Sequence, residues 1–167
     1  RSTLFPYTTL FRSGYEDASA SGAEYPLQVM NPHYLRRAHS VFDNIGWLRE
    51  AWTNPVFIST ADADAAGVSD GDTVLVSSPY GQCVRNACVY AGLMPGVVAL
   101  PHGAWVAVDE ETGIDVAGAD NCLTGPAPNG QGVSGYNSAL CKIEKYTGEA
   151  LAPDAEQPLR IVCKDGE

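Results

Sequence analysis

The 167-residue chain contains little charge and few basic residues. Charged residues make up 18% of it, and 20 acidic residues against 10 lysines and arginines give a formal net charge of −10. Such a surface repels the phosphate backbone of nucleic acids and anionic membrane surfaces. We therefore expect no nucleic-acid partner.

Long hydrophobic runs are also absent. The apolar stretch Val97–Leu100 is bounded by Pro95, Gly96 and Pro101, whereas a membrane-spanning helix needs about 20 apolar residues. We expect no direct membrane insertion. What the sequence has instead is 45% hydrophobic residues with 17 glycines and 11 prolines, which is typical of one turn-rich globular domain.

The cysteines and histidines lack the spacing of several known sites. Five cysteines without a Cys-x-x-Cys pair argue against a full disulfide framework and against a zinc ribbon. The segment Gly132–Tyr136 misses the Gly-x-Ser-x-Gly nucleophile elbow by one position. His33, His39 and His102 do not have the spacing of a helical metal-binding pair. We expect polar or cofactor-facing histidines, no metal ligand and no catalytic residue.

The N-terminal segment is expected to be foreign to the fold. Residues Thr3–Ser13 read TLFPYTTLFRS, which resembles a common sequencing-adapter oligonucleotide translated in frame. We predict that residues 1–13 derive from an adapter and that the chain is a fragment of a longer protein. Residues 14–24 are predicted to be a linker, residues 25–150 the domain, and residues 151–167 a tail.

Short β-prone segments dominate the predicted domain. Helical spacing is loose over 41–52, where Gly46 breaks it, and a short helix over 61–66 is capped by Thr60 and ended by Gly67. Turn formers fill residues 121–136, and a loop this long in a compact domain is usually functional. Strands are predicted at 25–30, 55–59, 73–77, 83–90, 97–100 and 140–146. This pattern favours a small β-barrel.

One cluster of donors stands out in this acidic chain. Arg36 and Arg37 are followed by His39 and Ser40, and guanidinium donors match the paired oxygens of a phosphate or a polar heterocycle. The alternative is a basic surface patch that pairs with the nearby Asp43 and Glu50. These residues alone do not decide between the two interpretations.

A series of short motifs follows in order between residues 25 and 146. They are Pro32–Tyr34, Arg37–Ser40, Phe42–Glu50, Asn54–Pro55, Ala61–Val74, Met94–Leu100, Gly103–Trp105, Asn121–Thr124 and Ile143–Lys145. In this register they closely resemble the C-terminal domain of dimethyl sulfoxide reductase family molybdoenzymes. Val41 departs from the family, in which many members have glutamine after His-Ser.

The resemblance implies a mainly β fold, a double-psi β-barrel with short helices and long loops that cover a cofactor. It implies binding of bis(molybdopterin guanine dinucleotide) with molybdenum. The family's Gly-Asn element corresponds either to Gly130-Gln131 or to the segment ending at Asn137. The cofactor-binding residues carried over by motif position are Arg37, His39, Ser40, Asn54, Gly103, Trp105, Asn121, Thr124 and Asn137.

The resemblance also indicates what other parts of such an enzyme supply. In this family the molybdenum ligand, the iron–sulfur cysteines and the substrate funnel lie upstream of this domain. The whole enzyme is expected to reduce S-oxides, N-oxides or related organic acceptors, and the isolated fragment to be inactive. Trp47–Glu50 most resembles the membrane-associated branch, which implies an iron–sulfur subunit, a membrane anchor subunit and a location on the outer face of the bacterial cytoplasmic membrane.

Two other functions compete with this one. A stand-alone double-psi barrel that serves as an interaction module would not need the Arg37–Ser40 loop or a glycine-rich lid. A pyruvoyl decarboxylase on the same kind of barrel would need a Gly-Ser cleavage site, and the chain has no Gly-Ser dipeptide.

Overall fold

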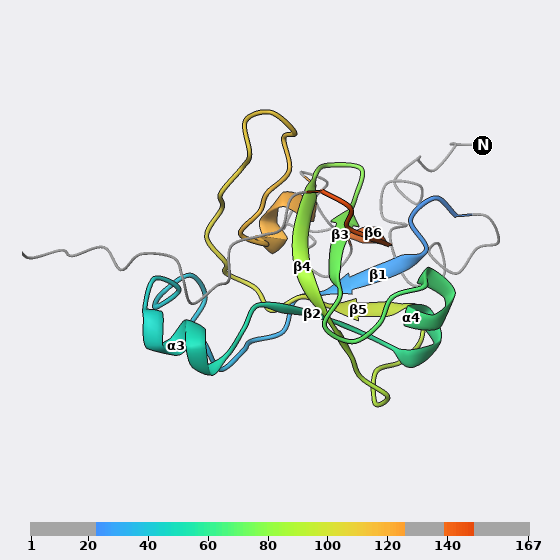
Figure 1. Cartoon of the computed structure of the whole chain (residues 1–167), viewed down its shortest axis with the longest axis horizontal. Helices are drawn as coiled ribbons and strands as arrows, with labels where there is room; N and C mark the ends of the chain where they lie inside the picture. Colours follow the sequence, from blue (N-terminus) through green and yellow to red (C-terminus); the bar gives the residue numbers. More distant parts are fainter. Residues whose placement is uncertain (1–22, 126–138, 149–167) are drawn as a thin grey trace, which may run out of the picture.

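The computed structural model describes residues 23–125 and 139–148. Six strands within these residues close into a barrel with the hydrogen-bonded order β1-β5-β2-β4-β3-β6 (Figure 1). They are β1 (Leu27–Met30), β2 (Pro55–Ile58), β3 (Thr73–Ser77), β4 (Gln82–Val89), β5 (Val97–Ala99) and β6 (Leu140–Lys145). The mainly β barrel with short helices that the sequence predicted is confirmed. The predicted adapter, nearly all of the linker, residues 126–138 and the tail lie outside the described residues.

Alternating side chains explain why the sheet closes around a core. In β1 the buried Leu27 and Val29 alternate with the more exposed Gln28 and Met30, and β3 alternates in the same way. Full burial of each valine or leucine contributes about 1.5–3 kcal/mol to folding. The core is built mainly from the inward-facing residues Leu27, Val29, Val56, Ile58, Val74, Val76, Val98, Leu100, Leu123, Cys141 and Ile143.

Helix α4 (Thr60–Ala66) has clear local signals at both of its ends. The Ser59 hydroxyl accepts a hydrogen bond from the backbone N–H of Asp62 (3.1 Å), and Gly67 ends the helix with φ of 64°. Gly67 is therefore confirmed as the stop. The predicted cap Thr60 is wrong by one position, because Ser59 has the extended backbone that an N-cap requires and Thr60 is already helical.

Helix α3 (Gly46–Ala51) begins at the glycine that was expected to break it. Residues 34–45 form turns instead, with isolated bridges between Tyr34 and Arg37 and between Ala38 and Val41. Positive φ angles at His39 (52°) and Phe42 (75°) prevent a continuous helix there. The helical spacing over 41–45 was therefore misleading.

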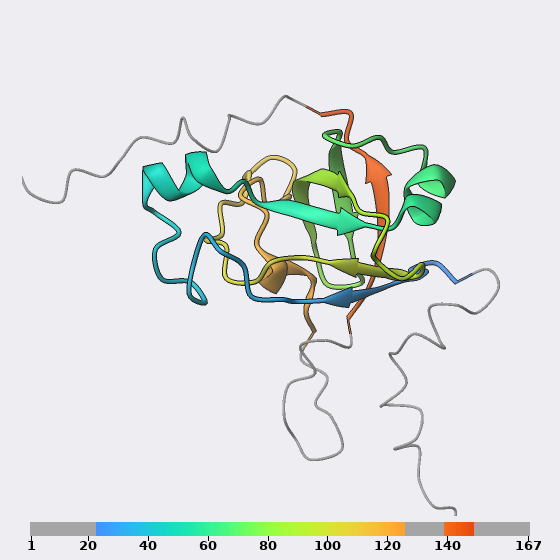
Figure 2. The same cartoon turned by 90° about the horizontal axis from the view of Figure 1, so that it is seen from below.

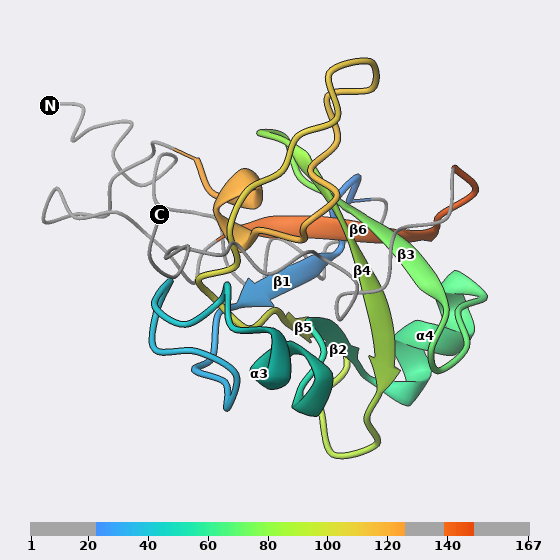
Figure 3. The same ribbon diagram turned by 60° about the vertical axis from the view of Figure 1, so that its left-hand side comes forward.

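The two helices lie at opposite ends of the barrel (Figures 2 and 3). The segment 31–45, the long connection 101–119 and the 3₁₀ helix η1 (Asp120–Leu123) lie toward the end that carries α3. We call this the loop end and the other the α4 end. None of the helices in the described part of the chain has the length and apolar character needed to cross a membrane.

Candidate functional site

Parallel pairing of β1 with β5 builds the base of the candidate site. The register pairs Val29 with Val98 and Met30 with Ala99, so both strands leave the barrel at the loop end. Backbone hydrogen bonds continue past the strands, from Leu100 to Met30 (2.9 Å) and from the His102 N–H to the Pro32 carbonyl oxygen (3.2 Å). Segments about 70 positions apart in the sequence thus lie side by side.

The Arg37–Ser40 loop folds tightly onto the residue that follows His102. Gly103 has a φ of 88°, and a Cβ atom at this position would lie 1.9 Å from the carbonyl oxygen of His39. Only glycine permits both this conformation and this approach. The loop itself carries strain, because His39 is a non-glycine residue with positive φ.

These segments and η1 enclose a pocket of about 530 Å³. Four of the residues predicted from the sequence, His39, Ser40, Gly103 and Asn121, line it together. The remaining lining residues are Asn31, His102 and Asp120. The pocket therefore presents two imidazoles, a hydroxyl, two amides and a carboxylate.

Asp120 is the polar group that ties the pocket walls together. Its carboxylate is buried and accepts hydrogen bonds from the Asn31 amide (3.1 Å) and from the backbone N–H of Gly103 (3.0 Å). One side chain from η1 thereby fixes the ends of both β1 and β5. A carboxylate held by N–H donors in this way keeps its negative charge satisfied while buried.

Arg37 lies behind the pocket rather than in its lining. Its side chain has no exposed surface. The guanidinium donates to the carboxylate of Asp43 (2.8 Å), to the side-chain oxygen of Asn54, and to the carbonyl oxygens of Pro101 (3.1 Å) and His102 (2.9 Å). The protein therefore uses this guanidinium to join the Arg37–Ser40 loop to the end of β5.

Three guanidinium groups surround the buried carboxylate of Asp43. Arg36 lies 3.1 Å, Arg37 2.8 Å and Arg49 3.8 Å from its oxygens. Burial, opposed by Asp43, lowers the pKa of Arg36 to about 10. The pairing with Asp43 that the alternative interpretation expected is present, but it is buried rather than on the surface.

A fourth buried arginine, Arg85 in β4, holds the connection 101–119 in place. It donates to the carbonyl oxygens of Gly118 (2.8 Å), Pro55 (3.0 Å) and Pro101 (2.9 Å). The fully buried carboxylate of Asp115 accepts the backbone N–H groups of Ala107 (2.7 Å) and Ala119 within the same connection. Sequence reasoning missed both residues.

The other predicted residues support the site or lie outside it. Asn54 donates to the carbonyl oxygens of Ala117 and Gly118 (3.2 Å each). The indole N–H of Trp105 donates to the Ser40 carbonyl oxygen (2.8 Å). Thr124 donates to the carbonyl oxygen of Asn121 at the end of η1 (3.0 Å) and does not line the pocket. Asn137 lies outside the described residues.

Asn31 and His102 could have been found from their positions only if the parallel pairing of the two preceding strands had also been known. Each follows closely on a predicted strand, and polar residues at the ends of parallel strands meet at one edge of a sheet. The parallel pairing of those strands was not predicted. The histidine spacing was also misleading, because the barrel brings His33, His39 and His102 together from three separate segments.

Comparison with known proteins gives matches over most of the described residues. Residues 27–139 match the family model described as "Molydopterin dinucleotide binding domain". The chain is 36% identical over 141 residues to dimethyl sulfoxide reductase DmsA of Escherichia coli K12, which covers 83% of this chain and 17% of that protein. It is 35% identical over 151 residues to a trimethylamine-N-oxide reductase of Haemophilus influenzae, covering 83% of this chain and 18% of that protein.

A solved structure supports the architecture. Acetylene hydratase from Pelobacter acetylenicus superimposes with a TM-score of 0.56 over 74% of this chain and 19% of that one, at 22% sequence identity. At this identity the likeness concerns the fold alone. The chain spans less than a fifth of the length of the curated relatives it matches.

Proposed function

Because the chain belongs to the family of molybdopterin dinucleotide-binding domains, we propose that the pocket at the loop end binds the organic part of that cofactor. The observation that carries the proposal is the convergence of His39, Ser40, Gly103 and Asn121 on one pocket. These residues come from three separate segments, and the sequence motifs alone predicted each of them as a cofactor contact.

The chemistry of the pocket suits a polar heterocycle that carries phosphates. Imidazole, hydroxyl and amide groups can both donate and accept, which matches the mixed edge of a pterin or a guanine. Among the described lining residues the carboxylate is that of Asp120, and its oxygens already accept hydrogen bonds from Asn31 and Gly103, so they hold the pocket walls together. The residues present therefore fit the cofactor.

Arg37 has an indirect role in this proposal. Its donors hold Pro101, His102 and Asn54, so it sets the distance between the two walls that carry His39 and Gly103. We assign the direct contacts to His39, Ser40 and Asn121, and the positioning of these contacts to Arg37, Asn54 and Trp105. Thr124 positions Asn121 through their hydrogen bond, and Asn137 stays a proposed contact.

At the level of the whole enzyme, the domain is proposed to belong to the catalytic subunit of a reductase that acts on S-oxides, N-oxides or related acceptors. The dinucleotide is proposed to be the guanine form. When bound, the molybdenum cofactor supplies the redox chemistry, and this chain is proposed to supply binding and orientation but no ligand to the molybdenum. From the resemblance we further propose an iron–sulfur cluster in the preceding part of the subunit, an iron–sulfur subunit and a membrane anchor subunit. The resemblance also supports a location on the outer face of the bacterial cytoplasmic membrane.

An apolar surface beside α3 is proposed to contact preceding domains of the same subunit. Leu35, Val41, Phe42 and Trp47 are each at least half exposed, and three of them line a shallow groove with Arg36 and Arg37. Exposed apolar groups gathered in this way are typical of protein contacts. The same surface is what the alternative interaction-module function would use.

Cofactor content tests the proposal. We would express the catalytic subunit that carries this domain in a host that makes the cofactor, and measure molybdenum and guanine nucleotide per polypeptide. Ser40→Ala and Asn121→Ala are expected to lower both contents together. Lys142→Ala, in an exposed pair with Glu144, is the matched control. Wild-type contents in both pocket variants would contradict the proposal.

A further inference from the structure

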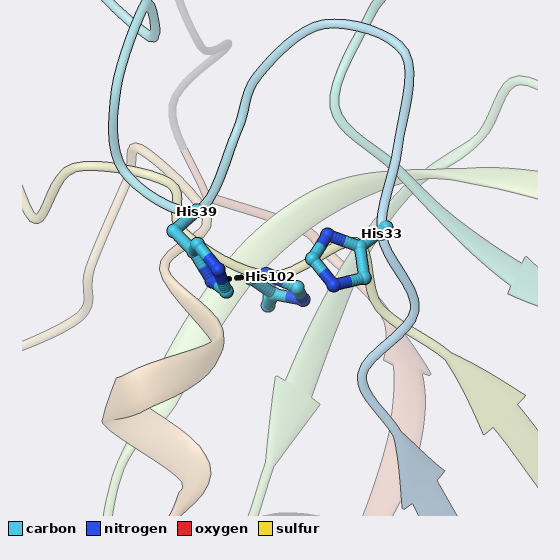
Figure 4. Close-up of side chains that lie close together, drawn as sticks. All are labelled: His33, His39 and His102. Carbon is cyan, nitrogen blue, oxygen red and sulfur yellow. Dashed lines mark hydrogen bonds between the residues drawn. The ribbon is translucent and has the colours of Figure 1, made fainter.

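All three histidines of the chain lie together at the loop end. His33 follows β1, His39 lies in the Arg37–Ser40 loop, and His102 follows β5. Figure 4 shows the three rings facing a common space. Each residue offers one ring nitrogen, and these nitrogens all lie within 4.8 Å of one another.

The spacing is close to that of three imidazoles around one metal ion. A Zn–N bond is about 2.0–2.1 Å, so tetrahedral ligand atoms lie about 3.3–3.4 Å apart. The distance from His102 Nε2 to His39 Nδ1 is 3.1 Å. The centroids of the rings lie 4.5, 5.0 and 5.1 Å apart, and His33 is edge-on to both of the others. The nitrogen lone pair lies in the ring plane, so the rings would turn about their side-chain bonds to direct their lone pairs at one ion.

The backbone around the histidines positions them without an ion. His102 Nδ1 lies 3.3 Å from the carbonyl oxygen of Asn31, so it carries the proton that it donates there. His102 Nε2 is then an acceptor, and the short contact is donated by His39 Nδ1. For metal binding, the His39 proton would move through solvent from Nδ1 to Nε2, so that His39 Nδ1 and His102 Nε2 both offer a lone pair to the ion. In many metal sites a backbone carbonyl accepts the second N–H of a ligating histidine and so orients the ring. The carbonyl of Asn31 has this position next to His102.

We propose that His33, His39 and His102 form a three-histidine site for a divalent transition-metal ion, with a fourth coordination position open. Imidazole nitrogen selects zinc, cobalt, nickel or copper over magnesium and calcium. Two of the ligands are exposed and one is half-buried, so an ion reaches the site from solvent. The net charge of −10 favours cations near this surface.

The site shares His39 and His102 with the cofactor pocket, but His33 does not line that pocket. The metal ion and the cofactor would therefore compete for His39 and His102, whereas His33 would contact the metal ion alone. The inference stands on the geometry of the protein without cofactor and does not depend on the proposed function. Substitution of His33 separates the two.

Titration of the 167-residue chain with Zn²⁺ and Co²⁺ tests the site. After removal of metals with a chelator, we would measure Zn²⁺ affinity by calorimetry and follow the three imidazole C–H resonances by NMR. The expected result is one ion per chain, with all three imidazole signals shifted together. Mg²⁺ at the same concentrations is expected to shift none of them.

Single substitutions decide which groups hold the ion. Loss of an outer partner typically costs about 10- to 100-fold in metal affinity, and His33→Gln, His39→Gln or His102→Gln is expected to cost more than that. His33→Gln is the most informative, because the residue is exposed and its replacement leaves the fold intact. The matched control is Glu110→Gln, on the exposed connection 101–119, which is expected to bind Zn²⁺ like the wild type.

Two results would overturn the proposal. One is wild-type Zn²⁺ affinity in His33→Gln, which would leave no three-histidine site. The other is sulfur-to-cobalt charge-transfer absorption in the Co²⁺ complex, which would assign the ion to cysteines. Failure of the cofactor-content test would leave the Zn²⁺ and Co²⁺ results unchanged, so the two proposals fail separately.

Discussion

The two ends of the barrel are stabilised by different physical means. At the α4 end, a serine cap and a left-handed glycine act over short sequence distances. At the loop end, Arg37, Asp43, Arg85, Asp115 and Asp120 are all buried. The side chains of Arg37, Arg85 and Asp120 make hydrogen bonds that span tens of residues. The structure of the α4 end therefore follows from local sequence signals. The polar contacts of the loop end can form only after the barrel has closed, because their partners are distant in sequence.

The largest expected effect comes from removing the charge at the centre of the loop end. Asp43→Ala leaves three buried guanidiniums without their carboxylate, and loss of one partner in a buried pair costs about 3–5 kcal/mol. Urea denaturation followed by circular dichroism measures the free energy of unfolding. Asp43→Asn removes the charge but keeps the shape of the side chain. We expect its free energy of unfolding to lie between those of Asp43→Ala and the wild type.

An exposed ion pair provides the contrast. Lys145 lies 3.0 Å from Asp72 on the surface, and exposed pairs contribute little to stability. Lys145→Ala is therefore expected to leave the denaturation midpoint within experimental error. Equal losses in Asp43→Ala and Lys145→Ala would remove the distinction between buried and exposed charge.

Two glycines with nearly the same backbone angle sharpen the comparison. Gly103 and Gly71 have φ of 88° and 83°, but only Gly103 has atoms where a Cβ would lie, whereas the space around Gly71 is open. Gly71→Ala should cost only the backbone strain, about 1–2 kcal/mol. Gly103→Ala adds a clash with the His39 carbonyl and should cost about 2–4 kcal/mol. A smaller loss for Gly103→Ala would show that the Arg37–Ser40 loop moves away freely.

Alkaline pH is expected to weaken the barrel core between the two ends. Burial raises the pKa of Cys83 to about 12 and also raises the pKa of Cys141. The folded protein therefore keeps these protons where the unfolded chain, with a thiol pKa of 9.0, loses them. The stability contribution is complete below pH 9 and lost as pH rises toward 12, by about 1.4 kcal/mol per thiol at pH 10.

The control for this prediction is the Cys83→Ala, Cys141→Ala variant. Its free energy of unfolding should fall less between pH 8 and pH 10 than that of the wild type, measured in the same urea series. A parallel fall in both proteins would assign the alkaline loss to other groups.

A modest and local effect is expected at the α4 end. Ser59→Ala removes the N-cap of α4 and should cost about 1 kcal/mol. Because the cap is far from the pocket, the imidazole resonances of the three histidines should keep their wild-type positions. Shifts at the histidines in this variant would show that the two ends are coupled.

The difference between the ends also decides what the sequence predicts. All six strands were predicted to within about two residues, and Gly67 as the stop of α4, because alternation and caps are local signals. The burial of Arg37 was not predictable, since its partners at Pro101 and His102 come from the end of β5. The burial of Arg85 was not predictable either. Its position in a strand does not indicate that three distant carbonyl groups accept hydrogen bonds from its guanidinium. Motif position found four pocket residues, but Asn31, His102 and Asp120 required the parallel pairing of β1 with β5.

The central claim is that the loop end, and not the α4 end, receives the dinucleotide. The most direct measurement is amide chemical-shift mapping of the 167-residue chain titrated with molybdopterin dinucleotide released from a molybdoenzyme. We predict the largest shifts at Asn31, His39, Ser40, Gly103 and Asn121, with α4 unchanged. Shifts centred on α4, or none at saturating cofactor, would contradict the account.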